Sequence, residues 1–217
     1  MYPEVSAAVK RLDSILPLVS GFKSLNSDDA ALYCKLLNSY VLQGRTLSRG
    51  EVAELVNDAE QSLTNIANNK LIVLDTTGNP SGVYPFTSEE REHKVHVNGM
   101  TVHCMCALDA LAVSPMFTIV TVIDSQCRVT SEQIHLEQSA TNFSSGTLDA
   151  WFGINWGAAA IDTVCAASLC MEMIFLVNEA VAREWLTESP DTREIFDLPE
   201  AVAFAAGFFV PLSENCK

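Results

Sequence analysis

The first 80 residues show helical periodicity interrupted by turn-forming residues. Apolar side chains recur every three or four positions in four segments, which are residues 5–16, 31–41, 52–56 and 59–66. This spacing predicts four amphipathic helices. Pro17 is expected to end the first helix, residues 26–28 to cap the second and Gly44 to end it. Ser48 and Glu51 have the form of a capping box before the third helix.

A short β-hairpin is predicted where this helical region ends. Residues 71–74 and 82–86 are rich in β-forming side chains, and residues 77–80 (Thr-Gly-Asn-Pro) form a turn between them. Helices followed by a small hairpin have the outline of a winged helix. We therefore predict an N-terminal winged-helix-like helical domain over residues 1–80 and a second domain over residues 81–217.

The second domain opens with alternating residues around Asn98-Gly99, a two-residue turn typical of β-hairpins. Further patterns predict strands over 117–123, 129–136 and 151–156, and helices over 106–113, over 178–186 and from 198 onward. Residues 158–177 fit either a buried helix or a loop followed by a strand. The expected class is α+β, with the winged-helix-like region followed by a mixed, mainly antiparallel β-sheet domain with packed helices.

The net negative charge of the chain argues against some classes of binding partner. The sequence has 217 residues and a formal net charge of -14, and residues 81–217 hold six Lys and Arg against eighteen Asp and Glu. Because phosphate binding depends on clustered basic side chains, we expect no nucleic-acid partner. Charged residues interrupt the first 20 positions, and the apolar run at 201–209 is too short to span a bilayer. We therefore expect a cytoplasmic protein with no membrane partner.

The seven cysteines are an odd number, and in a cytoplasmic protein we expect free thiols, with no role for Cys34 or Cys216. Cys106 and Asp109 are spaced so that, on a helix, thiol and carboxyl share one face. A cysteine in the first turn of a helix also has its thiolate favoured by unpaired backbone N–H groups. The alternative is that Cys106 is a small core residue and Asp109 a solvated one.

Two segments resemble the active-site sequences of the organomercurial (alkylmercury) lyase family. Residues 106–111 read Cys-Ala-Leu-Asp-Ala-Leu, and Cys170 lies ahead of an apolar segment and fifteen residues before Trp185. The similarity continues in order over roughly residues 28–205 and includes the segment that ends at Cys127. The chain is thus similar to this family well beyond the candidate site.

The resemblance implies an enzyme, a carbon-mercury lyase that demethylates methylmercury in mercuric resistance and detoxification. Cys106 and Cys170 would be thiolate ligands, Asp109 the proton carrier, and Hg(II) a product bound by both cysteines. Mercury is a soft cation that prefers thiolate ligands, and a nearby carboxylic acid can protonate the leaving carbon. No cofactor is expected. Low-molecular-weight thiols or a mercury reductase would accept the Hg(II).

Other sulfur-containing residues extend this assignment. Met105 stands where the family often has an aromatic residue, and Cys104 adds a thiol two positions before Cys106, so both are expected to contribute to substrate binding. Cys127 matches a structural cysteine of the family. Cys165 is expected to be a core residue, as free cysteines are often buried.

The rival interpretation is a non-catalytic soft-metal binding protein of the same fold, which would store or deliver mercury or copper. Its ligands would be Cys104, Cys106, Cys170 and His103. A looser zinc or copper site could be formed by His93, His96 and His103 with Cys104 and Cys106. The presence of Asp109 favours the enzyme, because a pure binder needs no general acid.

Overall fold

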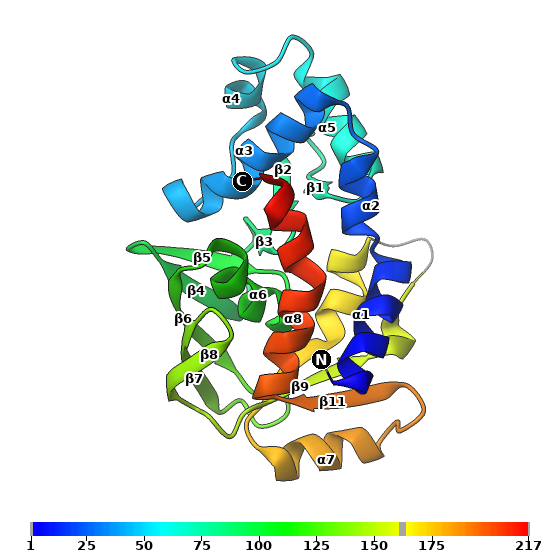
Figure 1. Ribbon diagram of the computed structural model, residues 1–217, viewed down its shortest axis with the longest axis vertical. Helices are drawn as coiled ribbons and strands as arrows, with labels where there is room; N and C mark the ends of the chain where they lie inside the picture. The colour runs from blue at the N-terminus through cyan, green and yellow to red at the C-terminus, as the bar shows by residue number, and fades with distance from the viewer. Residues whose placement is uncertain (1, 161–163, 217) are drawn as a thin grey trace.

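The computed structural model describes residues 2–160 and 164–216, and its N-terminal part is helical (Figure 1). The helices are α1 (Pro3–Ile15), α2 (Leu18–Lys23), α3 (Ser27–Gln43), α4 (Arg49–Ala53) and α5 (Ala59–Asn68). The four helices predicted from periodicity are confirmed. Helix α2 was not predicted, because Pro17 ends α1 but then serves as the N-cap of a further short helix.

Local hydrogen bonds explain where α3 and α4 begin and end. The Asn26 side chain accepts hydrogen bonds from the backbone of Asp28 and Asp29, and Gly44 takes a left-handed conformation with φ of 73° after the last turn of α3. Ser48 and Glu51 form the predicted capping box, and α4 therefore begins at Arg49, earlier than its apolar pattern indicated.

An eight-stranded antiparallel sheet occupies the middle of the chain. Its strands are β1 (Ile72–Leu74), β2 (Pro80–Val83), β3 (Phe86–Thr87), β4 (His93–Val97), β5 (Met100–Cys104), β6 (Val120–Gln126), β7 (Gln133–Ser139) and β8 (Asn142–Gly146). The spatial order is β1-β2-β3-β5-β4-β6-β7-β8. The hairpin at Asn98-Gly99 is confirmed, with positive φ at both residues. The predicted hairpin of residues 71–86 lies at one end of this same sheet.

A second, three-stranded antiparallel sheet carries the C-terminal helices. It comprises β9 (Trp151–Asn155), β10 (Met173–Leu176) and β11 (Arg193–Asp197) in the order β10-β9-β11, with α7 (Glu179–Thr187) and α8 (Leu198–Ser213) after it. Of the ambiguous segment 158–177, residues 161–163 lie outside the described residues. The rest consists of 3-10 turns followed by β10, so the loop-and-strand alternative is correct.

Helix α6 (Ala107–Phe117) and helix α8 form the centre of the core. Figure 1 shows α8 (red) between α1 and α6, and it packs on both. Residues 107–114 of α6 are all buried, which explains why this segment is apolar on every side. Among residues 2–160 and 164–216, no helix has the length and apolar character needed to cross a membrane. These mixed helices and antiparallel strands confirm the α+β class.

The expectation of free thiols is wrong for one pair of cysteines. Cys34 of α3 and Cys216 form a disulfide, whereas Cys104, Cys106, Cys127, Cys165 and Cys170 are free and buried. The pair is 182 residues apart in sequence, and α8 returns the end of the chain to α3 (Figure 1). An odd number of cysteines argues against a complete disulfide framework but leaves room for one bridge.

Gly153 of β9 offers a test of this packing. A Cβ atom there would lie 2.8 Å from the Trp185 ring and 3.0 Å from Leu176, both in the core. Gly153→Ala should therefore lower the free energy of unfolding by about 1–3 kcal/mol through overpacking. Urea unfolding measures the change. Gly50→Ala is the control, since its nearest atom would be 3.8 Å away; equal stabilities of the two variants would contradict the packing described.

Candidate active site

The junction between β5 and α6 places Cys106 and Asp109 together. Cys106 is the N-cap residue of α6 in an extended conformation, and Asp109 lies in the first turn. Both side chains are buried. Because Asp109 is three residues further along the helix, its carboxyl lies on the same side as the Cys106 thiol, as the spacing predicted.

The Cys170 thiol lies beside Cys106 and Asp109, although it comes from a distant part of the chain. It lies in a 3-10 turn, η3 (Leu169–Glu172), immediately before β10. The Sγ atoms of Cys106 and Cys170 and a carboxylate oxygen of Asp109 all lie within 4.8 Å of one another. The Cys106 Sγ is also 3.7 Å from the Met173 Sδ. Two thiols and one acid, predicted from separate segments, therefore form one buried group.

Burial sets the protonation of this group. It raises the pKa of Asp109 to about 7, although hydrogen bonding from Cys106 opposes the shift. Burial also raises the pKa of the Cys106 thiol to about 12. Hydrogen bonding to Cys106 and Cys165, with burial, holds the pKa of Cys170 well above its ordinary value. Desolvation thus outweighs the expected stabilisation of a Cys106 thiolate by the helix N-terminus, and the resting cysteines are neutral thiols.

Asp109 has one oxygen available for chemistry. Its Oδ2 atom is buried and accepts no hydrogen bond from any of the described residues. A buried polar oxygen without a partner costs free energy, so its retention calls for an explanation. A carboxyl that carries a proton on this oxygen near neutral pH can act as an acid, and once ionised it can accept a proton from a neighbouring thiol.

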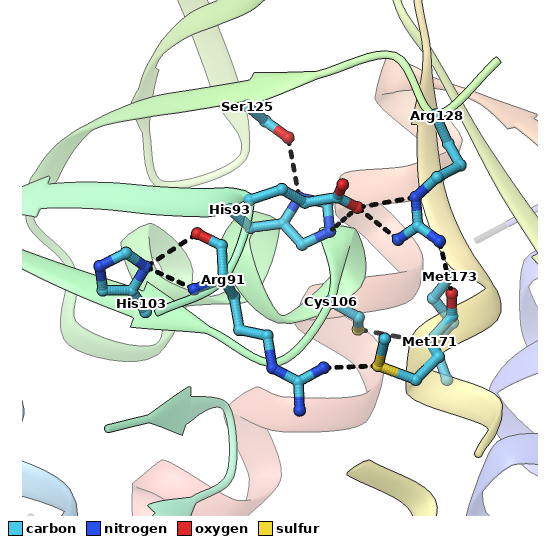
Figure 2. Close-up of polar contacts among 9 residues, drawn as sticks. Arg91, His93, His103, Cys106, Ser125, Arg128, Met171 and Met173 are labelled. Carbon is cyan, nitrogen blue, oxygen red and sulfur yellow. Dashed lines mark hydrogen bonds and ion pairs between the residues drawn. The ribbon is translucent and has the colours of Figure 1, made fainter. Parts of the chain in front are cut away.

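A polar network restrains the turn that carries Cys170 (Figure 2). The guanidinium of Arg128 donates a hydrogen bond of 3.1 Å to the backbone oxygen of Met171 and also binds Glu92. Burial raises the pKa of Glu92, but hydrogen bonds from His93 and Arg128 outweigh it and lower the pKa to about 2. His93 in turn contacts Ser125 at 2.8 Å. Arg128 and Glu92 belong to no recognisable motif, so the sequence did not predict their place near the site.

The other predicted site residues occupy different positions. Cys104 is buried on β5 and does not belong to the group of three. Met105 is buried, with its Cε atom close to Gly82. Their assignment to substrate binding stays a prediction. Cys127 is buried in a turn, where its Sγ accepts a hydrogen bond from the Thr130 backbone.

The histidines do not join the thiols. His93 bonds Ser125 and Glu92, His96 lies 2.7 Å from Asp124, and His103 bonds the backbone of Arg91. Within the described part of the chain, no histidine belongs to a group of metal-ligand atoms as close as that of Cys106, Asp109 and Cys170. The looser zinc or copper site of the sequence analysis is therefore not assembled.

A cavity leads toward the thiols from the side of the N-terminal helices. It has a volume of about 530 Å³ and lies between the end of α1, the end of α5, β1 and the segment around Cys165. Tyr84 and Cys165 are among its lining residues, and the Cys165 Sγ is 3.5 Å from that of Cys170. Burial raises the pKa of Tyr84 far above its ordinary value. Neither residue was predicted to belong to the site.

The chemistry of the three side chains fits a soft, thiol-binding metal compound. Two thiols can coordinate one soft cation in a linear or bent arrangement, whereas ions such as magnesium prefer oxygen ligands. Structural zinc sites usually use four protein ligands, whereas the close group found among the described residues holds three. The acid beside the thiols adds a proton-transfer group that simple metal storage does not require.

Comparisons with known proteins agree with this site. A sequence model of the family described as MerB, alkylmercury lyase, matches residues 86–210, which include Cys106, Asp109 and Cys170. The solved structure of the mercury-bound form of MerB2 has the same fold, with a TM-score of 0.71 and 16% sequence identity over 92% of this chain and 98% of that chain. No curated protein matches the chain. Because the family model covers more than half of its length, the chain belongs to the alkylmercury lyase family.

Proposed function

We propose that this alkylmercury lyase cleaves the carbon-mercury bond by protonolysis, with Cys106 and Cys170 as mercury ligands and Asp109 as proton carrier. The observation that carries the proposal is the approach of the three ligand atoms to within 4.8 Å of one another in a buried site. A hydrocarbon and Hg(II) are the products.

The first step exchanges the ligand on mercury. The substrate arrives as an organomercury cation bound to a thiolate or halide, and the Cys106 sulfur displaces that ligand. The Cys106 proton leaves with the displaced thiolate or halide. Because the pKa of Cys106 is about 12, this thiol reacts in its neutral form and loses its proton as the sulfur-mercury bond forms.

The second step uses the remaining thiol proton. Asp109, when ionised, accepts the proton of Cys170 as its sulfur coordinates mercury. Two thiolates now donate electron density to the metal, and the attached carbon becomes basic. Asp109 transfers its proton to that carbon, the carbon-mercury bond breaks, and the carboxylate is regenerated. Hg(II) remains bound by Cys106 and Cys170, so every proton is accounted for.

The remaining parts of the proposal concern cofactors, binding partners, localisation and the division into domains. The cycle needs no organic cofactor or resident metal, and external thiols or a mercury reductase accept the Hg(II). The net charge of -14 supports a protein without a nucleic-acid partner, and we place it in the cytoplasm without a membrane partner. We also propose that residues 1–80 form a winged-helix-like domain and residues 81–217 the catalytic domain.

Asp109→Asn tests the role of the acid. The amide has the same shape but cannot shuttle a proton, so we expect methylmercury to bind while methane formation falls by on the order of 10²- to 10⁴-fold. Gas chromatography of the headspace over reduced protein, methylmercury and excess thiol measures the methane. If the wild-type protein binds methylmercury but releases no methane, it is a binder; if the variant releases methane at the wild-type rate, Asp109 is not the proton carrier.

Cys106→Ser and Cys170→Ser test the two-thiolate step. Each change replaces a soft sulfur ligand by a hydroxyl, which mercury binds poorly, so both variants should lose methane formation. Cys127→Ser is the matched control, because it removes a buried thiol outside the group of three. Normal turnover by Cys170→Ser would exclude coordination by two protein thiolates.

The raised pKa of Asp109 predicts a stability that depends on pH. The folded protein binds the proton more tightly than the unfolded chain, since burial raises the pKa from 3.8 to about 7. The resulting stabilisation is complete below pH 3.8 and is lost as the pH rises through 7. Asp109→Asn, which never ionises, should therefore be more stable than the wild type at pH 8 by a few kcal/mol, and nearly equal to it at pH 4.

Urea unfolding of both proteins at the two pH values measures this difference. Asp149→Asn, which removes an exposed carboxylate, is the control and should show no comparable change between them. A stability difference between Asp109→Asn and the wild type that is the same at pH 4 and pH 8 would mean that Asp109 titrates normally.

A further inference from the structure

A third thiol, that of Cys165, lies on the cavity side of the two proposed mercury ligands. Cys165 lies in a 3-10 turn, η2 (Cys165–Ala167), and its Sγ is 3.5 Å from that of Cys170. It is nonetheless not part of the close group formed by Cys106, Cys170 and Asp109. In space, the sulfur atom of Cys170 therefore lies between those of Cys165 and Cys106.

The solvent exposure of the three thiols decreases in the same spatial order, from Cys165 through Cys170 to Cys106. The exposed fraction is 8% for Cys165, 3% for Cys170 and 1% for Cys106, and Cys165 lines the cavity of about 530 Å³. A molecule that enters this cavity meets Cys165 first. The inner thiols are almost completely covered by protein, which leaves little room for a bulky thiol carrier to deliver mercury to them directly.

The turn that carries Cys165 is held by specific contacts. The Tyr84 hydroxyl accepts a hydrogen bond of 3.1 Å from the backbone N–H of Ala166, and the Ser168 backbone N–H bonds the oxygen of Cys165 at 3.1 Å. Tyr84 also lines the cavity. These contacts hold the Cys165 thiol between the cavity and Cys170. A residue that served only to fill the core would not need to border a cavity.

We propose that Cys165 is the transfer thiol of this enzyme, which takes the organomercury cation from its carrier in the cavity and passes it to Cys170. The proposal rests on the function proposed above and adds a residue to it. Mercury moves between thiols by direct exchange, in which the incoming sulfur must approach the metal before the old bond breaks. A separation of 3.5 Å between Cys165 and Cys170 allows one mercury to contact both.

Each transfer balances in atoms and protons. The carrier thiolate bound to the organomercury cation is displaced by the Cys165 sulfur and leaves with the Cys165 proton. The Cys170 sulfur then displaces Cys165, which recovers a proton from Cys170. On this route Cys170 is therefore the first of the two ligands and Cys106 the second, the reverse of the order given above for direct delivery. Asp109 accepts the Cys106 proton and transfers it to the carbon. The Hg(II) product can leave by the reverse path, with Cys165 as the first thiol to share it and two external thiols as the final acceptors.

Cys165→Ser tests this role, with Cys127→Ser as the matched control for loss of a buried free thiol. The probe is methylmercury bound to glutathione, and rapid-quench sampling measures how fast mercury becomes bound to protein in which the Cys34–Cys216 disulfide is intact. We expect capture by Cys165→Ser to slow by about tenfold or more, as for the loss of a positioned reacting group. Methane formed per methylmercury already bound, in a single turnover, should stay at the wild-type rate.

The outcomes separate this proposal from the proposed function. Capture by Cys165→Ser at the rate of the wild type and of Cys127→Ser would overturn the transfer role. A loss of methane formation from bound methylmercury would overturn it too, because Cys165 would then act in cleavage itself. If the wild type forms no methane, the proposed function fails, while the capture rates still decide whether Cys165 is the first thiol to bind mercury.

Discussion

Exclusion of water from Cys106, Cys170 and Asp109 is the constraint on which the rest of the structure depends. In water, the acid would be ionised at neutral pH and the thiols would exchange freely with other ligands. Burial raises the pKa of Asp109 to about 7 and keeps both thiols neutral, so one site holds two thiols and a transferable proton. This environment requires α6 to be enclosed on all sides, which α8 and the sheet provide.

The thiols of Cys106 and Cys170 are held in place by different parts of the structure. Cys106 is fixed by the start of a regular helix, whereas Cys170 lies in a short 3-10 turn with little stability of its own. The hydrogen bond from Arg128 to Met171 and the pairing of β10 with β9 compensate for this weakness. Because Glu92 and His93 orient Arg128 from β4 and the segment before it, the eight-stranded sheet contributes to the position of a thiol that it does not carry.

Much of the fold could be predicted from local sequence patterns. The features that were not predicted either show no such pattern or depend on contacts between distant parts of the chain. The capped helix after Asn26, the capping box at Ser48 and the turn at Asn98 are confirmed, since each depends on neighbouring residues. Strand β8 and the Cys34–Cys216 disulfide were missed, because one is largely polar and the other joins distant segments. In the site, the helical spacing placed Asp109 beside Cys106, but no spacing rule places Arg128, Tyr84 or Cys165 near Cys170.

The arrangement of sulfur atoms also bears on a conflict inherent in mercury chemistry. Two thiolates in a dry site bind Hg(II) strongly, which favours cleavage of the carbon bond but opposes release of the product. Release needs an additional thiol close to the metal, yet a fully exposed thiol would admit water and change the acidity of Asp109. The third thiol proposed for transfer lies at the edge of a cavity, 3.5 Å from the Cys170 sulfur and outside the group that contains the acid, which is a position that meets both demands. On the proposed route, ligand exchange occurs at Cys165, beside the dry site, and does not require that site to open.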